Sequence, residues 1–211
     1  MHFRKFIFPI LAMFVLSNCA KLKTISLQGK DFSKDGHAWS ARPNEIRGHF
    51  YFFDARAWTW NGQGDGPGVT RSFINFNLSG LPDKSRIINA KLFLYQNKTS
   101  ENKDAKHSTL SGSNECVLQR IISAWSDEDI SWAKQPKTTT EHQVMIPASI
   151  SPVQDYTIDI TPLIVDMIKE KETSYGLMLR LVNEEAYRAV VFCSTDSDDP
   201  SLYPKLVITY R

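Results

Sequence analysis

Short runs in which apolar and polar residues alternate recur along most of this chain. A period of two is typical of a β-strand with one buried face, because successive side chains point to opposite sides of a sheet. The clearest runs are residues 70–78, 88–96, 116–121, 155–160, 175–182, 188–194 and 204–210. Segments rich in Gly, Pro, Asp and Ser, the residues that turns require, lie between them at 61–68, 79–85 and 194–204. The pattern predicts at least seven short strands.

One stretch has a helical period instead. Apolar residues share one helix face between residues 161 and 171, at Leu163, Ile164, Met167 and Ile168. Pro162 stands at the start of this stretch and Gly176 follows soon after its end, as is common for helix termini. Many short strands with one short helix predict an all-β fold, an antiparallel two-sheet β-sandwich with a helix near 161–171.

Alternation also assigns side chains to the two faces of each strand. The set on one face is apolar and is expected to form the core between the sheets: Ile74, Phe76, Leu78, Leu92, Leu94, Leu177, Leu179 and Leu181. The opposite set mixes aromatic and basic side chains: Arg71, Phe73, Asn75, Lys91, Phe93, Tyr95, Met178 and Arg180. Two interpretations of this second face stay open. It is either an open surface that stacks on sugar rings and pairs with their acid groups, or a second layer of packing beneath a loop or the helix.

The N-terminus has the pattern of a secretory signal. His2, Arg4 and Lys5 precede an apolar block at residues 6–16, which is shorter than the about 20 residues that span a bilayer. The stretch from Leu16 to Cys19 resembles a bacterial lipobox, in which the cysteine is lipidated and becomes the first residue of the mature chain. A plain signal peptide with an incidental cysteine is the alternative.

The signal pattern sets the expected organisation of the chain. We expect a lipoprotein signal peptide at 1–18, a polar tether at 19–25 and one domain at 26–211. The expected location is the cell envelope, at the outer membrane or the cell surface, after export through the inner membrane. Several acyl chains on Cys19 would anchor the protein stably to the membrane.

Charge and cysteine content bear on the possible partners of the chain and on whether it contains a disulfide. Without Arg4 and Lys5, 23 basic side chains remain against 23 acidic ones, which argues against nucleic acid as a partner. Apart from Cys19, the cysteines are Cys116 and Cys193. Outside the cytoplasm these two are either a disulfide or two buried free thiols.

The sequence offers no arrangement typical of catalysis. Acidic groups cluster at residues 127–129, 184–185 and 196–199, each in a predicted loop, and no Gly-x-Ser-x-Gly or Cys-x-x-Cys motif occurs. Trp125 and Trp132 flank the first cluster, and we expect them to pin that loop to the end of the sandwich. The five histidines have no metal-ligand spacing. No cofactor is expected to be required.

The segment around 194–204 offers oxygen ligands at alternating positions. Asp196 and Asp198 are therefore candidates for a structural calcium site, although the glycine and distal glutamate of an EF-hand are missing. A solvated acidic turn before the last strand is the alternative.

Two features favour ligand binding. Trp58 and Trp60 would face the same way on an extended backbone, with glycines following at 62–68 that let a flat ligand approach. Two tryptophans that close one end of the fold are the alternative, since Trp is usually buried. Counting faces adds cationic and aromatic candidates for a uronic-acid site, where arginine can pair with a carboxylate through two hydrogen bonds: Arg71, Lys91, Tyr95, Arg180 and Arg188.

Nine stretches, in order and at compatible spacing, resemble the DNRLRE domain, which is also described as carbohydrate-binding module family 96. They are residues 30–45, 55–62, 71–82, 88–95, 114–121, 124–136, 154–168, 175–196 and 204–210. The resemblance, closest to forms on Bacteroidetes-type surface proteins, covers essentially the whole chain from residue 26. It implies a jelly-roll-like sandwich that binds carbohydrate without catalysing a reaction, in some members an acidic polysaccharide such as alginate.

This chain departs from the family pattern in one turn. Asn77 stands where relatives usually carry aspartate, so the turn is less suited to a cation. Since most relatives are attached to enzymes or large surface proteins, two functions stay open. The chain either captures polysaccharide or serves as a structural module that docks an envelope protein. A hidden lyase or hydrolase activity ranks far below both.

Overall fold

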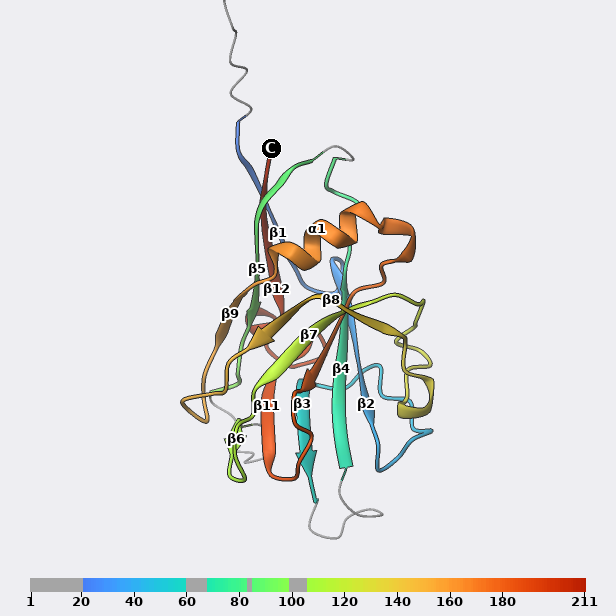
Figure 1. The fold of residues 1–211 in the computed structure, drawn as a ribbon, viewed down its shortest axis with the longest axis vertical. Coiled ribbons are helices and arrows are strands. Elements are labelled where there is room, and N and C mark those ends of the chain that lie inside the picture. Colours follow the sequence, from blue (N-terminus) through green and yellow to red (C-terminus); the bar gives the residue numbers. More distant parts are fainter. Residues whose placement is uncertain (1–20, 60–67, 83–84, 99–105) are drawn as a thin grey trace, which may run out of the picture.

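The structure is a computed structural model that describes residues 21–59, 68–82, 85–98 and 106–211. Two antiparallel sheets face each other, and one helix lies across one end of them (Figure 1). The predicted two-sheet β-sandwich with one short helix is confirmed. Residues 1–20, with the signal peptide and Cys19, and Trp60 in the 60–67 segment lie outside the described residues.

The smaller sheet has four strands in the order β1-β12-β5-β9. Their bounds are β1 Lys23–Gln28, β12 Lys205–Tyr210, β5 Ile87–Leu94 and β9 Tyr156–Asp159. Lys23 of β1 lies opposite Tyr210 of β12, so the first and last strands are hydrogen-bonded neighbours. Strand β1 thus overlaps the C-terminal part of the segment 19–25 that is expected to form a tether.

The larger sheet has eight strands in the order β6-β11-β3-β4-β10-β7-β8, with β2 paired to β4 beside this path. Their bounds are β2 Ser33–Trp39, β3 Phe52–Trp58, β4 Gly68–Phe76, β6 Ser108–Thr109, β7 Cys116–Ile121, β8 Thr138–Ile146, β10 Leu177–Leu181 and β11 Arg188–Cys193. The helix α1 is Thr161–Lys169, and short 3₁₀ turns occur at Trp132–Lys134, Lys171–Thr173 and Pro200–Leu202.

The main core lies between the two sheets, as the alternation of leucines predicts. It contains Ile74, Phe76, Leu92, Leu94, Leu177, Leu179 and Leu181, with Leu78 packed against its edge. Helix α1 closes one end of this core through Leu163, Ile164 and Met167. The helix begins with Pro162 in its first turn, where the missing N–H costs no hydrogen bond.

The outer face of the larger sheet is covered around Phe73 and Met178. Of the two interpretations of the aromatic and basic face, the structure there shows the second layer of packing. Phe73 and Met178 are buried in a second cluster beneath Ile130, Trp125 and Trp132 of the segment that follows β7. The indole N–H of Trp125 donates to the Tyr175 carbonyl at 2.8 Å, which fixes this segment to the sheet. The expectation that Trp125 and Trp132 pin the loop is confirmed, and this face is not the open sugar-binding surface.

Both described cysteines are free, buried thiols. Cys116 begins β7 and Cys193 ends β11, and three strands separate β7 from β11 in the sheet. The disulfide alternative is therefore not realised in this structure. Burial raises the pKa of both thiols, so neither is a reactive thiolate. Among the described residues, no helix has the length and apolar character needed to cross a membrane.

Candidate functional site

The residues predicted to bind ligand do not form one site. Lys91 and Tyr95 belong to the outer face of the smaller sheet, where the ammonium of Lys205 lies 5.6 Å from the Tyr95 ring and 4.8 Å from the Phe93 ring. Trp58 ends β3 at the far end of the larger sheet. The predicted ring-and-cation surface is thus divided among separate regions.

The three arginine candidates are engaged inside the fold. Arg71 donates from Nε and Nη2 to the two carboxylate oxygens of Glu184, at 2.8 and 2.9 Å, and its guanidinium lies 4.7 Å from the ring of Trp132. Arg180 donates to the carbonyl of Leu181 at 3.0 Å. Arg188 donates to the carbonyl of Ser111 at 3.1 Å and pairs with Glu185. The forked pairing expected for a sugar carboxylate is already used within the chain by Arg71.

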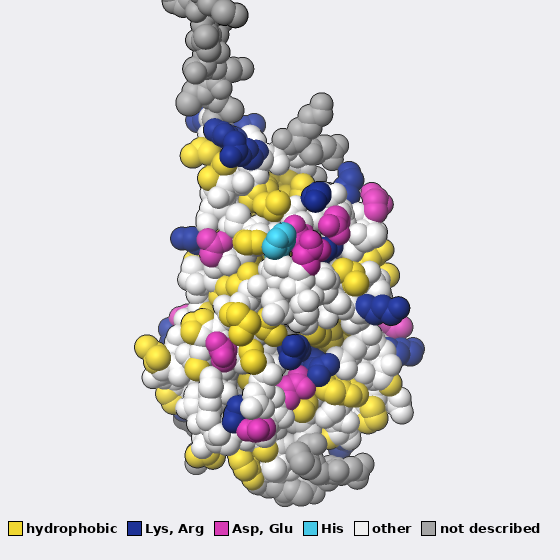
Figure 2. All heavy atoms as spheres, in the orientation of Figure 1, with side chains coloured by type: hydrophobic (Ala, Val, Ile, Leu, Met, Phe, Trp, Pro, Cys, Tyr) yellow, Lys and Arg dark blue, Asp and Glu magenta, His cyan; other side chains and the backbone are white. Residues whose placement is uncertain are grey.

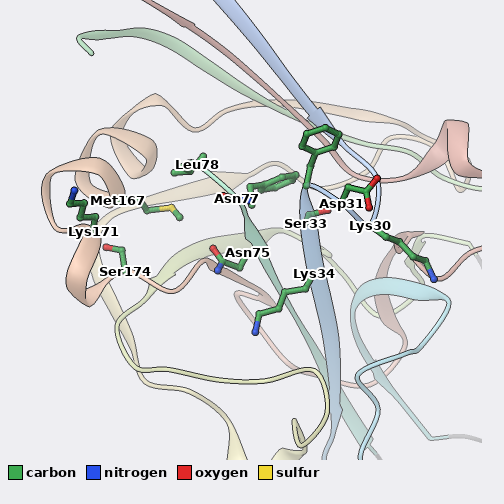
Figure 3. A pocket seen from close by; sticks show the side chains of 12 residues that line it. Lys30, Asp31, Ser33, Lys34, Asn75, Asn77, Leu78, Met167, Lys171 and Ser174 are labelled. Carbon is green, nitrogen blue, oxygen red and sulfur yellow. The ribbon is translucent and has the colours of Figure 1, made fainter. Parts of the chain in front are cut away.

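A groove of about 420 Å³ lies where the β1–β2 turn and the end of β4 meet the segment after α1 (Figure 3). Its described lining is Lys30, Asp31, Phe32, Ser33, Lys34, Asn75, Phe76, Asn77, Leu78, Met167, Lys171 and Ser174. Three lysines stand against one aspartate, so the groove is locally basic. On the face drawn in Figure 2, by contrast, basic and acidic side chains are interspersed.

The β1–β2 turn sets one wall of this groove. The carbonyl of Gly29 accepts from the N–H groups of Phe32 and Ser33, each at 3.0 Å, and Gly29 has φ +102°, which glycine adopts without strain. The Phe32 carbonyl accepts from the N–H of Asn77 at 2.8 Å, which fixes the turn to the end of β4. The turn leaves the Phe32 ring 43% exposed, so an aromatic face is accessible beside the lysines.

Two of the lysines are held in place by the fold. Lys34 donates to the carbonyl of Trp125 at 3.0 Å, and its ammonium lies 4.6 Å from that residue's ring. Lys30 donates to Asp196 at 2.7 Å, and this hydrogen bond raises the Lys30 pKa. Lys171 follows α1 and reaches the groove from the opposite wall (Figure 3). Lys30 and Lys34 thus also lie beside carboxylates outside the lining, those of Asp196 at 2.7 Å and Asp127 at 3.8 Å.

Neutral polar groups complete the lining. The half-buried amide of Asn75 makes no hydrogen bond within the described part of the chain, so its donors and acceptor are available to a ligand. Asn77 accepts from the N–H of Ser79 at 3.1 Å through Oδ1. The Ser174 hydroxyl accepts from Arg120 at 3.0 Å, and this buried arginine is paired with Glu170 at 3.0 Å.

The groove continues along α1 into a second hollow of about 410 Å³. The two hollows share Leu78, Met167 and Lys171, and the second adds the apolar side chains of Leu81, Pro82 and Ile168. The combined groove is basic at one end and apolar at the other. Its extent fits a segment of polymer better than a single small molecule.

The predicted calcium ligands do not come together with other carboxylates. Asp196 binds Lys30, and Asp198 is exposed. Among the described residues, the ligand atoms that converge within 4.8 Å belong to His49, Asp127 and Glu128 instead. Lys34 lies 3.8 Å from Asp127, so part of that negative charge is already neutralised. Calcium at 196–198 stays a prediction.

Comparison with protein families identifies the chain. Residues 56–210 match the model of carbohydrate-binding module family 96. The chain belongs to this family. No curated protein matches it. The matched region begins within β3 and contains β4 to β12, and therefore the Asn75, Asn77, Lys171 and Ser174 side of the groove, whereas Lys30 and Lys34 precede it.

Sequence reasoning missed the groove of the module. Its residues come from three segments, 30–34, 75–78 and 167–174, that no local pattern connects. Asn77 was the one available signal, because the resemblance to the family implies an aspartate at its position. That replacement removes a negative charge from the lysine-lined end of the groove.

Proposed function

We propose that this chain binds an acidic polysaccharide, such as alginate, in the groove between the β1–β2 turn and α1, without catalysing its cleavage. The observation that carries the proposal is the lining of the groove, where Lys30, Lys34 and Lys171 outnumber the one aspartate and the amide of Asn75 makes no hydrogen bond within the described part of the chain. Ammonium groups pair with sugar carboxylates, and the amide matches the hydroxyl groups of the same rings.

The shape of the groove supports a polymeric ligand. A uronic-acid chain presents a carboxylate on every ring together with apolar C–H faces. The lysine-lined end suits the carboxylates, while Phe32 and the apolar hollow around Leu81 and Ile168 suit the C–H faces. Net charge near zero and a locally basic groove together favour selective rather than general binding of polyanions.

A non-catalytic role fits the lining as well as the family. Glycosidases use two carboxyl groups that flank the bond they cleave. Of the described residues that line the basic end, Asp31 carries the one carboxylate. We propose that the protein retains polysaccharide at the cell envelope, anchored through lipid on Cys19, because β1 begins only four positions after that cysteine.

Asn77→Asp is a sharp test of this proposal. Aspartate keeps the oxygen that accepts from Ser79 and has nearly the same volume, but it adds a negative charge beside the lysines. The affinity of this variant for oligouronates cut from alginate, measured calorimetrically at low salt, should be about threefold to tenfold lower than that of the unchanged chain. The affinity of Lys171→Ala should be lowered to a similar extent. Added salt should weaken binding by the unchanged chain.

Lys137→Ala serves as the matched control, because Lys137 is exposed and lies outside the groove lining. Its affinity should equal that of the unchanged chain. A loss of binding in Lys91→Ala without any loss in Asn77→Asp would move the site to the outer face of the smaller sheet. No binding to acidic or neutral glycans would leave the docking of an envelope protein as the function.

A further inference from the structure

A separate hollow of about 260 Å³ lies at the opposite end of the larger sheet. Its described lining is Arg56, Trp58, Lys106, His107, Ser108, Pro152 and Ala189. In Figure 1, β6 and the end of β3 lie in the lower part of the fold, whereas α1 lies near the top. We propose that this hollow is a second sugar site, which takes one acidic sugar ring and makes the chain bivalent. The ligand class rests on the proposed function.

The aromatic wall of the hollow is held rigidly. The rings of Trp58 and Tyr187 meet edge to face, with centroids 5.3 Å apart and planes at 85°. Tyr187 has φ +72°, a conformation that costs free energy for a residue with a side chain. Its N–H donates to the carbonyl of Ala57 at 2.8 Å, and its carbonyl accepts from Ser108 at the same distance. This strained residue therefore orients the Trp58 indole beside the hollow.

Positive charge lines the same hollow. Arg56 is 4% exposed and donates from Nε to Asp54 at 2.8 Å, which fixes its guanidinium. Burial alone would raise the Asp54 pKa, but Arg56 and His37 lower it well below its usual range, so that partner stays ionised. Lys106 makes no ion pair within the described part of the chain. None of the described lining residues carries a carboxylate, and Asp54 behind the lining is already paired with Arg56, so Lys106 is the cation available to an anionic ring.

His107 forms a fixed neutral wall rather than a base. Its Nδ1 accepts from the N–H of Val191 at 2.9 Å, so the proton lies on Nε2, which donates to the Gln154 carbonyl at 2.7 Å. Burial lowers the His107 pKa, which keeps the ring neutral. Because both ring nitrogens are engaged, and the Ser108 hydroxyl already donates to Tyr187, recognition is left to Trp58 and Lys106.

The two proposed sites lie near opposite ends of β4. Trp58 pairs with Gly68 at the start of β4, and Asn75 lies seven positions along that strand. At about 3.3 Å per residue the two sites are on the order of 23 Å apart. One chain can therefore hold two different polymer strands, and cross-linking of polymer follows from this geometry.

The test counts sites with the full chain carrying Cys19→Ser, using a short oligouronate cut from alginate as the probe. Calorimetry should give two sites per chain for this protein and one for Lys106→Glu, which retains the groove. Trp58→Phe, which keeps an apolar ring, should weaken the second site about threefold or more. Light scattering with long alginate should show cross-linked particles that Lys106→Glu fails to form.

The outcomes separate the two proposals. A single site that Asn77→Asp weakens and Lys106→Glu leaves unchanged would overturn the second site and keep the proposed groove. A single site that only Lys106→Glu removes would support the hollow and overturn the groove. Equal cross-linking by the Lys106→Glu and unchanged chains would contradict bivalency through this hollow.

Discussion

Gly48 lies directly against the backbone of Asp127. A Cβ atom on Gly48 would come within 1.7 Å of the Asp127 carbonyl oxygen, so no side chain fits there. The contact locks the loop before β3 onto the loop that carries Trp125 and Trp132. Through those rings it keeps Phe73 and Met178 covered.

Gly48→Ala should therefore destabilise the fold by about 2–4 kcal/mol, because the clash involves backbone that cannot rotate away. Urea unfolding followed by tryptophan fluorescence measures the change in free energy of unfolding. Gly80→Ala is the control, since its nearest neighbour is the flexible end of the Ile25 side chain at 3.2 Å. Equal effects at both positions would contradict the close approach.

The buried carboxyl of Asp35 should make the stability of the fold depend on pH. Burial raises its pKa from 3.8 to about 6, partly offset by the hydrogen bond from the Thr195 N–H at 2.8 Å. The fold thus favours the protonated carboxyl. The stability that this raised pKa contributes is fully present below about pH 4. It is lost as the pH rises through 6, which lowers the free energy of unfolding by about 3 kcal/mol.

Asp35→Asn should remove this dependence, because asparagine stays neutral and still accepts from Thr195. Relative to the unchanged chain, the variant should gain stability at pH 8 and gain little at pH 4. Unfolding curves at the two pH values supply the comparison. Parallel behaviour of the two proteins across this range would show that Asp35 ionises in the fold as it does in the unfolded chain.

Cys116 and Cys193 should behave as protected free thiols. In a chain with Cys19→Ser and no reductant, a thiol-specific dye should label both cysteines in denaturant and neither one in the folded state, because both side chains are buried. Mass spectrometry counts the labels. Absence of labelling in denaturant, restored by reductant, would instead mean that the two cysteines form a disulfide.

The family match begins at residue 56, yet β1 and β2 complete the two sheets. Removal of residues 1–55 would leave the edges of β12 and β4 without their partners. Exposed edges of this kind favour aggregation. We expect residues 56–211 alone to sediment as aggregates and residues 21–211 to remain monomeric, as analytical ultracentrifugation would show. A stable monomer of the shorter piece would contradict this.

The core was predictable because it depends on local alternation. Leu177, Leu179 and Leu181 must share a face whatever the fold, and this face lies between the sheets. Alternation could not reveal what covers Phe73 and Met178, because the covering segment is distant in the sequence. Strands β2 and β3 also escaped the pattern, since they bury the charged residues Asp35, Asp54 and Arg56.

The candidate sites were harder to predict than the core. Face counting places Arg71 on an outer face but cannot show that Glu184, 113 positions later, already occupies its guanidinium. Lys171 carries no motif and enters the groove only because α1 lies across the end of the sandwich. Trp58, identified from the sequence, does line a hollow, but a different one from the groove.

The course of β1 decides where a mechanical load would be carried. Strand β1 links residue 21 to the turn at Lys30, and six residue pairs join it side by side to β12. A force applied between the N-terminal segment and that turn runs through the covalent backbone of β1, because both points lie at the ends of the same strand. The hydrogen bonds to β12 lie across that direction and hold the strand in place without carrying the load. Tension applied at this turn would therefore leave the pairing within the smaller sheet intact.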